Sequence, residues 1–162
     1  MKAFVHRLSL WALAVTLPAT VLAADPPVCP FKPAELESIF GVAFAEGRPG
    51  MEFKSGGMTM RDCRYSSKGY SLRVGTTVHP AATGAKDAVR ALAGRLQPIP
   101  NDPDGAAFQV DQGDATSPTL HYARNTLAVE LRIMGTYYSD PRNKAGELRA
   151  MQQKLARVRR VP

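Results

Sequence analysis

The sequence is poor in the residues and motifs on which catalysis and metal binding commonly depend. It holds 2 Cys among 162 residues, which excludes an all-cysteine zinc site and a miniprotein held by many disulfides. Neither Gly-x-Ser-x-Gly nor His-Glu-x-x-His occurs, and no glycine-rich phosphate loop precedes a predicted helix. The single tryptophan, Trp11, lies near the start of the chain, which argues against an aromatic platform for sugars. These absences argue against common hydrolases, metalloproteases and nucleotide-binding enzymes.

Long apolar runs are also scarce, and the clearest lies at residues 8–17. It follows Lys2 and Arg7, and the small residues of a peptidase site end at Ala23. The run is too short to cross a bilayer, which needs about 20 apolar residues. We therefore predict that residues 1–23 are a secretory signal peptide.

The remaining residues, 24–162, are too few for two full-sized domains, so we predict a single domain. Removal of Lys2 and Arg7 would lower the formal charge from +7 to +5. Pro26-Pro27-Val28 precede Cys29 in place of the small residues that mark a lipidated cysteine. We expect a soluble periplasmic or secreted protein without a membrane span.

Export places the two cysteines, Cys29 and Cys63, in an oxidising compartment, so they are predicted to form a disulfide. It would close a loop of about 35 residues and stabilise the fold by roughly 3–4 kcal/mol. The alternative is a reactive thiol or a metal ligand.

Hydrophobic periodicity predicts a mixed α+β domain. Helices are expected at 33–41, at 84–97 from an N-cap at Thr83, and after the Asp140 N-cap. Strands are expected at 51–53, 58–66, 70–79, 106–110, 119–123 and 127–134, with a rigid loop at 97–105. We predict an antiparallel sheet of about five strands with the helices packed on one face, a two-layer arrangement.

In that arrangement five polar side chains would point away from the helices: Arg73, His79, His121, Glu130 and Arg132. Together they could bind an anionic ligand or perform acid–base chemistry. The alternative is a solvated outer face, and strand order decides whether the residues meet.

Two metal sites are conceivable. Soft ligands for Cu(I) are available in Met51, Met58, Met60, His79 and His121. The alternative is that Met58 and Met60 fill the core. Oxygen ligands for calcium are available in Asp102, Asp104, Asp111 and Asp114. The competing interpretation of the acidic segment is a β-turn, with Pro103 second and Gly105 fourth. We predict no bound metal or other cofactor.

The C-terminal segment carries much of the positive charge, in Arg142, Lys144, Arg149, Lys154, Arg157, Arg159 and Arg160 against Glu147. Such a segment can complement the helix dipole or bind an anionic envelope polymer or acidic protein. Nucleic acid is excluded by export and by the lack of interleaved aromatics. The predicted partner-binding residues are Arg73, His121, Arg132, Tyr137, Tyr138, Arg149, Lys154 and Arg157.

The outline resembles small exported bacterial domains of unknown function. The resemblance is carried by Cys29, by Ile39-Phe40-Gly41 at the end of a short helix, by Cys63-Arg64-Tyr65 and by the helix after Asp140. In style it is also similar to periplasmic immunity proteins, which neutralise envelope-acting toxins. The predicted function is a binding or inhibitor protein acting by surface complementarity. The alternatives are a metal-binding module and a small enzyme using the open-face histidines.

Overall fold

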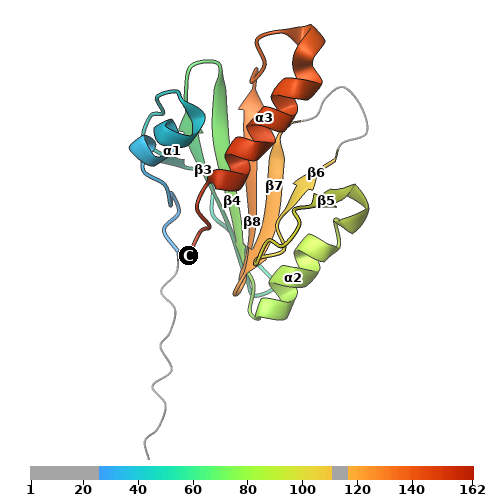
Figure 1. Ribbon diagram of the computed structural model, residues 1–162. Helices are drawn as coiled ribbons and strands as arrows, with labels where there is room; N and C mark the ends of the chain where they lie inside the picture. Colours follow the sequence, from blue (N-terminus) through green and yellow to red (C-terminus); the bar gives the residue numbers. More distant parts are fainter. Residues whose placement is uncertain (1–25, 111–116) are drawn as a thin grey trace, which may run out of the picture.

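The computed structural model describes residues 26–110 and 117–162 (Figure 1). The elements in the first half are α1 (Pro33–Phe40), β1 (Arg48–Pro49), β2 (Phe53–Ser55), β3 (Met58–Ser66), β4 (Tyr70–Val78) and α2 (Ala82–Arg90). Then follow the 3-10 turn η1 (Ala93–Arg95), β5 (Leu96–Pro98), β6 (Ala107–Gln109), β7 (Thr119–Arg124), β8 (Leu127–Gly135), the 3-10 turn η2 (Pro141–Asn143) and α3 (Lys144–Arg157). The predicted signal peptide lies outside the described residues.

The strands form one antiparallel sheet in the order β1-β3-β4-β8-β7-β6-β5, with β2 also paired to β3. The predicted hairpins, β3–β4 and β7–β8, are confirmed, and they join through β4 and β8 at the centre. The α+β class is therefore correct, but the sheet has 8 strands and not about five. The prediction missed β1 and β5, which are only two and three residues long. Such segments are too short to show a clear period of two.

The first helix forms where the sequence predicts it. Pro33 occupies the first turn, where its missing N–H costs nothing. Gly41 ends the helix in the left-handed conformation, with φ 74°, and its N–H donates to the carbonyl of Glu37. Leu36 and Phe40 are buried against the sheet.

The second helix is shorter than predicted. It spans Ala82–Arg90, and Thr83 does not cap it, because Ala81 is the N-cap residue. Leu96, which matched the helical spacing, instead begins β5 opposite Gln109 of β6. The predicted loop at 97–105 therefore starts inside a strand.

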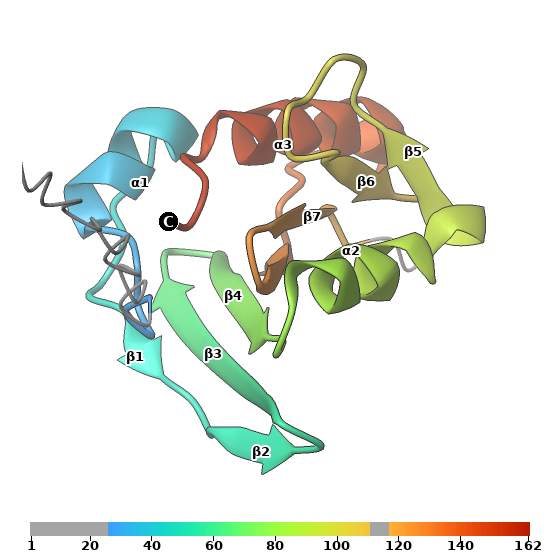
Figure 2. The ribbon, with the colours of Figure 1, turned by 90° about the horizontal axis from the view of Figure 1, so that it is seen from below.

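The helices do not all lie on one face, and this part of the prediction is wrong. Tyr122 of β7 accepts a hydrogen bond from the N–H of Val161, just beyond α3. The neighbouring His121 points to the opposite face, where it lines a hollow with Ala88 and Leu92 of the α2 segment. Figure 2 shows α1 and α3 on one side of β7 and α2 on the other. The small side chains of Ala123 and Ala128, paired on β7 and β8, let α2 approach that face.

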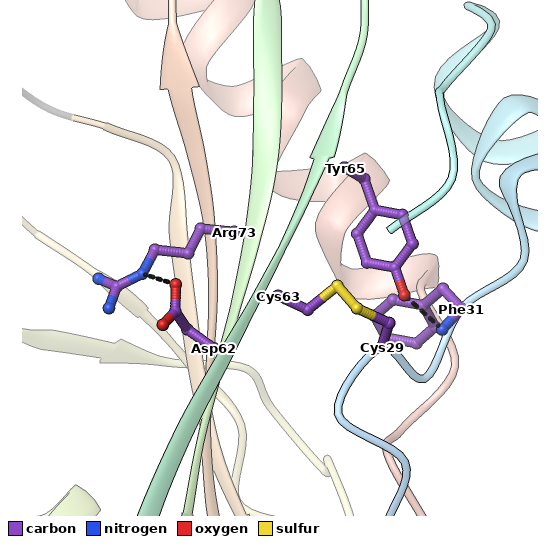
Figure 3. The surroundings of a disulfide bond; sticks show 6 residues. All are labelled: Cys29, Phe31, Asp62, Cys63, Tyr65 and Arg73. Carbon is purple, nitrogen blue, oxygen red and sulfur yellow. Dashed lines mark hydrogen bonds and ion pairs between the residues drawn. A yellow bond between two sulfur atoms is a disulfide. The ribbon is translucent and has the colours of Figure 1, made fainter. Parts of the chain in front are cut away.

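The face under α1 and α3, here called the closed face, carries the predicted disulfide. Cys29 and Cys63 are bonded, with their Cα atoms 5.3 Å apart (Figure 3). Beside them the N–H of Phe31 donates to the Tyr65 hydroxyl at 2.8 Å. A side chain at Gly47 would lie 2.8 Å from the Cys63 sulfur and 2.7 Å from the Tyr65 ring, so only glycine fits there.

The residues after α3 close this face. Val158 and Val161 are buried in the core. Arg159 pairs with Glu35 at 2.9 Å and donates to the carbonyl of Pro30. The C-terminal residues thereby hold α1 and the N-terminal segment, beside which the chain ends (Figures 1 and 2).

Candidate functional site

The opposite side of the sheet, here called the open face, brings charged side chains from adjacent strands into two rows. One row runs Asp62, Gly75, Glu130, His121 across β3, β4, β8 and β7. The next row runs Arg64, Arg73, Arg132 across β3, β4 and β8. Acidic and basic side chains therefore lie beside each other along the centre of this face. Figure 3 shows Asp62 and Arg73 on the side of the sheet away from the disulfide.

Ion pairs connect the two rows. Arg73 Nε lies 3.4 Å from Asp62 Oδ2, and its Nη1 lies 3.9 Å from Glu130 Oε1. Arg132 Nε lies 3.3 Å from the same Glu130 oxygen. The side chains of Arg73 and Arg132 are 40% and 35% exposed. Exposed ion pairs of this kind contribute little to stability, so these groups can exchange partners at small cost.

The sequence predicted His121 on an exposed surface, but the structure buries it, with 6% of the residue exposed. Its Nε2 lies 3.1 Å from Gln109 Oε1. Burial lowers the pKa of the imidazole below 6.5, which Glu130 opposes and Arg132 reinforces. The ring is therefore neutral at pH 7. With the amide oxygen facing it, Nε2 is the donor, and Nδ1 is left as an acceptor.

A hollow of about 280 Å³ lies where α2 meets the two rows. It is lined by Arg73, His121 and Glu130 from the sheet and by Leu92 after α2. A bound group would meet a guanidinium, a neutral imidazole and a carboxylate. Gly75 forms part of the floor, so a larger residue there would narrow the hollow.

His79 does not join this group, contrary to the prediction. It follows β4, and its N–H donates to the carbonyl of Thr126 in the β7–β8 turn. Its ring lies against Gly84 of α2. His121 instead lies opposite Glu130 in the β7–β8 register, farther along β8. The two histidines therefore serve different parts of the fold.

Apolar side chains extend the open face toward the sheet edge. Phe53 of β2 pairs with Met60 of β3, and these residues are 58% and 36% exposed. Met51, just before β2, is 88% exposed. The sequence predicted Met51 as a metal ligand in a short strand, and Met60 as a metal ligand or a core residue. The short β2 gave no signal of an exposed apolar patch.

His121 is not brought together with the methionines of the copper hypothesis. Met58 and Met60 lie on β3, whereas His121 lies on β7, and β4 and β8 separate these strands. Three strand spacings correspond to about 14 Å. Among the described residues, no group of three or more His, Cys, Asp and Glu side chains could hold a metal ion.

The acidic segment of the calcium hypothesis has a structural role. Asp102 Oδ1 accepts hydrogen bonds from the N–H groups of Asp104 and Ala106, at 3.0 and 3.1 Å. Its Oδ2 pairs with Arg160, which also lies 3.6 Å from Asp104. Burial raises the pKa of Asp102, but the Ala106 N–H and Arg160 outweigh it, and the net shift is downward. Asp111 and Asp114 lie outside the described residues.

The predicted partner-binding residues separate into different environments. On α3, Lys154 donates to the carbonyl of Phe40 at 2.8 Å, whereas Arg149 and Arg157 are exposed. Tyr137 and Tyr138 stack edge to face at 5.4 Å, and Lys144 lies over Tyr138. These residues lie apart from the rows that contain Arg73, His121 and Arg132.

No family model, curated protein or solved structure matches the chain. In the part of the chain that the structure describes, no helix combines the length and apolarity needed to cross a membrane.

Proposed function

We propose that this chain is an exported binding or inhibitor protein that recognises another protein of the cell envelope through its open face. The observation that carries the proposal is the exposed Phe53–Met60 pair on the face that also carries Asp62, Arg73, Glu130 and Arg132. Aromatic residues, methionine and arginine are the types enriched in protein interfaces.

The mixture of charges favours a protein over an anionic polymer. A polymer surface would be matched by basic residues alone, but Arg73 and Arg132 alternate with Asp62 and Glu130. Alternating charges suit a partner with a complementary pattern, because misaligned charges repel. An apolar contact at Phe53 would then supply binding energy beside this pattern.

Export itself remains part of the proposal. It is supported by the N-terminal apolar run at residues 8–17 and by the disulfide between Cys29 and Cys63. An immunity protein that neutralises an envelope-acting toxin is one form of this function, since it needs a shaped surface and no reactive group.

Cross-linking in cells tests the proposal. A photo-reactive amino acid at Met51, just before β2 and 88% exposed, would report proteins that contact this apolar edge of the open face. The cross-linked protein should be lost when Phe53→Asp or the pair Arg73→Glu and Arg132→Glu is introduced. The matched control is Arg149→Glu with Arg157→Glu on α3, whose residues are also exposed. A partner lost only in the control, or no cross-linked envelope protein at all, would refute the proposal.

A further inference from the structure

A second and larger hollow, of about 530 Å³, lies between α2 and the turn that joins β5 to β6. Its floor includes Ala107 of β6 and Ala123 of β7, both buried. Binding sites for small molecules have volumes of about 300–1,000 Å³, so this hollow has the size of a ligand pocket.

The walls are apolar. Val89 and Ala93 contribute from the α2 side, and Leu96 and Pro98 from β5. The two floor residues are alanines, and larger aliphatic side chains at their positions would fill the space. An apolar ligand chain could therefore replace water along the floor, at a gain of about 0.8 kcal/mol for each buried CH₂.

The rim of the hollow carries acidic residues on one side and basic residues on the other. The acidic side is neutralised by a basic residue from outside the rim. Asp102 and Asp104 form the turn side, and both pair with Arg160. Lys86 and Arg90 form the α2 side and are exposed. Within the residues that the structure describes, Arg90 pairs with Asp87, which is itself exposed, at 2.7 Å. The α2 side therefore offers positive charge to an anionic group.

The turn side of the hollow is held in place before any ligand binds. The carboxylate of Asp102 accepts the N–H groups of Asp104 and Ala106, which fixes the turn. Arg160 then ties the turn to Tyr122, with its guanidinium 4.7 Å from the ring centroid. A preformed wall lowers the entropy cost of binding.

We propose that this hollow binds a single-chain anionic amphiphile of the fatty-acid class. Its chain lies on Ala107 and Ala123, and its carboxylate lies beside Lys86 and Arg90. This site is independent of the protein-binding function proposed for Phe53 and Arg73.

Calorimetric titration with dodecanoate, below its micelle concentration, tests the proposal on the purified oxidised protein. We expect saturable binding of one dodecanoate per chain. Ala107→Leu should weaken binding about tenfold or more, because the added methylenes occupy the ligand's space. Lys86→Ala with Arg90→Ala should weaken dodecanoate binding about threefold and leave dodecanol binding unchanged.

Two controls separate this site from other apolar surfaces. Phe53→Ser, on the open face, should leave dodecanoate binding unchanged. In wild-type protein labelled at alanine methyl groups, the NMR signals of Ala107 and Ala123 should shift on binding. Those of Ala34, in α1, and Ala43, just after α1, should not shift. This second measurement does not depend on whether Ala107→Leu folds.

The proposal is overturned by no saturable binding, by shifts at Ala34 or Ala43 in place of Ala107 and Ala123, or by loss of binding in Phe53→Ser. Equal or tighter binding of dodecyltrimethylammonium would also overturn it, because the rim argument requires an anionic group.

Discussion

The two faces of the sheet use similar residues for different purposes. On the closed face and its margins, Arg159 and Arg160 pair with carboxylates from distant segments and hold the chain ends and a turn together. On the open face, Arg73 and Arg132 pair with carboxylates on the sheet itself and stay about one-third exposed or more. Arg160 is only 14% exposed. Arg159, however, is 48% exposed, more than Arg73 or Arg132. The comparison therefore shows that the place of the partner carboxylate, on a distant segment or on the sheet itself, separates a structural arginine from one available for binding.

Removal of the closed-face disulfide should have the largest effect on stability. Replacing Cys29 and Cys63 with alanine should lower the free energy of unfolding by about 3–4 kcal/mol, because the unfolded chain loses the cross-link that restricts it. Urea denaturation measures this change. A loss below about 1 kcal/mol would mean that the closed face is held by packing alone.

Replacement of Arg160 should have the next largest effect on stability. Arg160→Ala leaves Asp102 partly buried without its ion pair, and we expect a loss of about 2–3 kcal/mol in thermal or urea unfolding. Arg157→Ala, exposed on α3, is the matched control and should change stability by no more than about 0.5 kcal/mol. Equal effects would remove the distinction between buried and exposed arginines.

His121 should make stability depend on pH. Because burial lowers its pKa below 6.5, the unfolded chain binds the proton more readily than the folded chain. The stabilisation is therefore complete above pH 6.5 and is lost as pH falls through the lowered folded pKa. The loss is at most about 1.4 kcal/mol per pH unit. His121→Gln should flatten this part of the urea-midpoint profile, and an unchanged profile would assign it to other groups.

Arg73 should have the smallest effect on stability. Its two ion pairs are long and partly exposed, so Arg73→Ala should cost at most about 1 kcal/mol. Thermal unfolding of this variant next to Arg160→Ala provides the direct comparison. A cost as large as that of Arg160→Ala would give the open face a structural role.

The sequence was sufficient to predict the parts of the fold that rest on local patterns. Both central hairpins show alternating apolar residues on either side of a turn, and the α1 helix has a proline at its start and Gly41 at its end. The disulfide followed from a count of two cysteines in a chain predicted to be exported. Each of these signals lies within a few residues or depends on a simple count.

The remaining features depend on contacts between distant residues. The position of α2 follows from Ala123 and Ala128, whose small size became informative only when β7 and β8 paired. Arg160 meets Asp102, 58 residues earlier, so its structural role could not be distinguished from a free basic end. The open-face residues Arg73 and Arg132 were correctly predicted to share a face, because they occupy outward positions on strands with clear alternation.

The pairing of β4 with β8 joins residues that lie far apart in the chain. Each hairpin can form by local closure, but Tyr70 meets Gly135 only after all the intervening chain has been brought around. Such distant pairing slows folding. Cys29 and Cys63 both precede β4 in the chain. Their disulfide can therefore form, and join the first half of the chain covalently, before β8 pairs with β4.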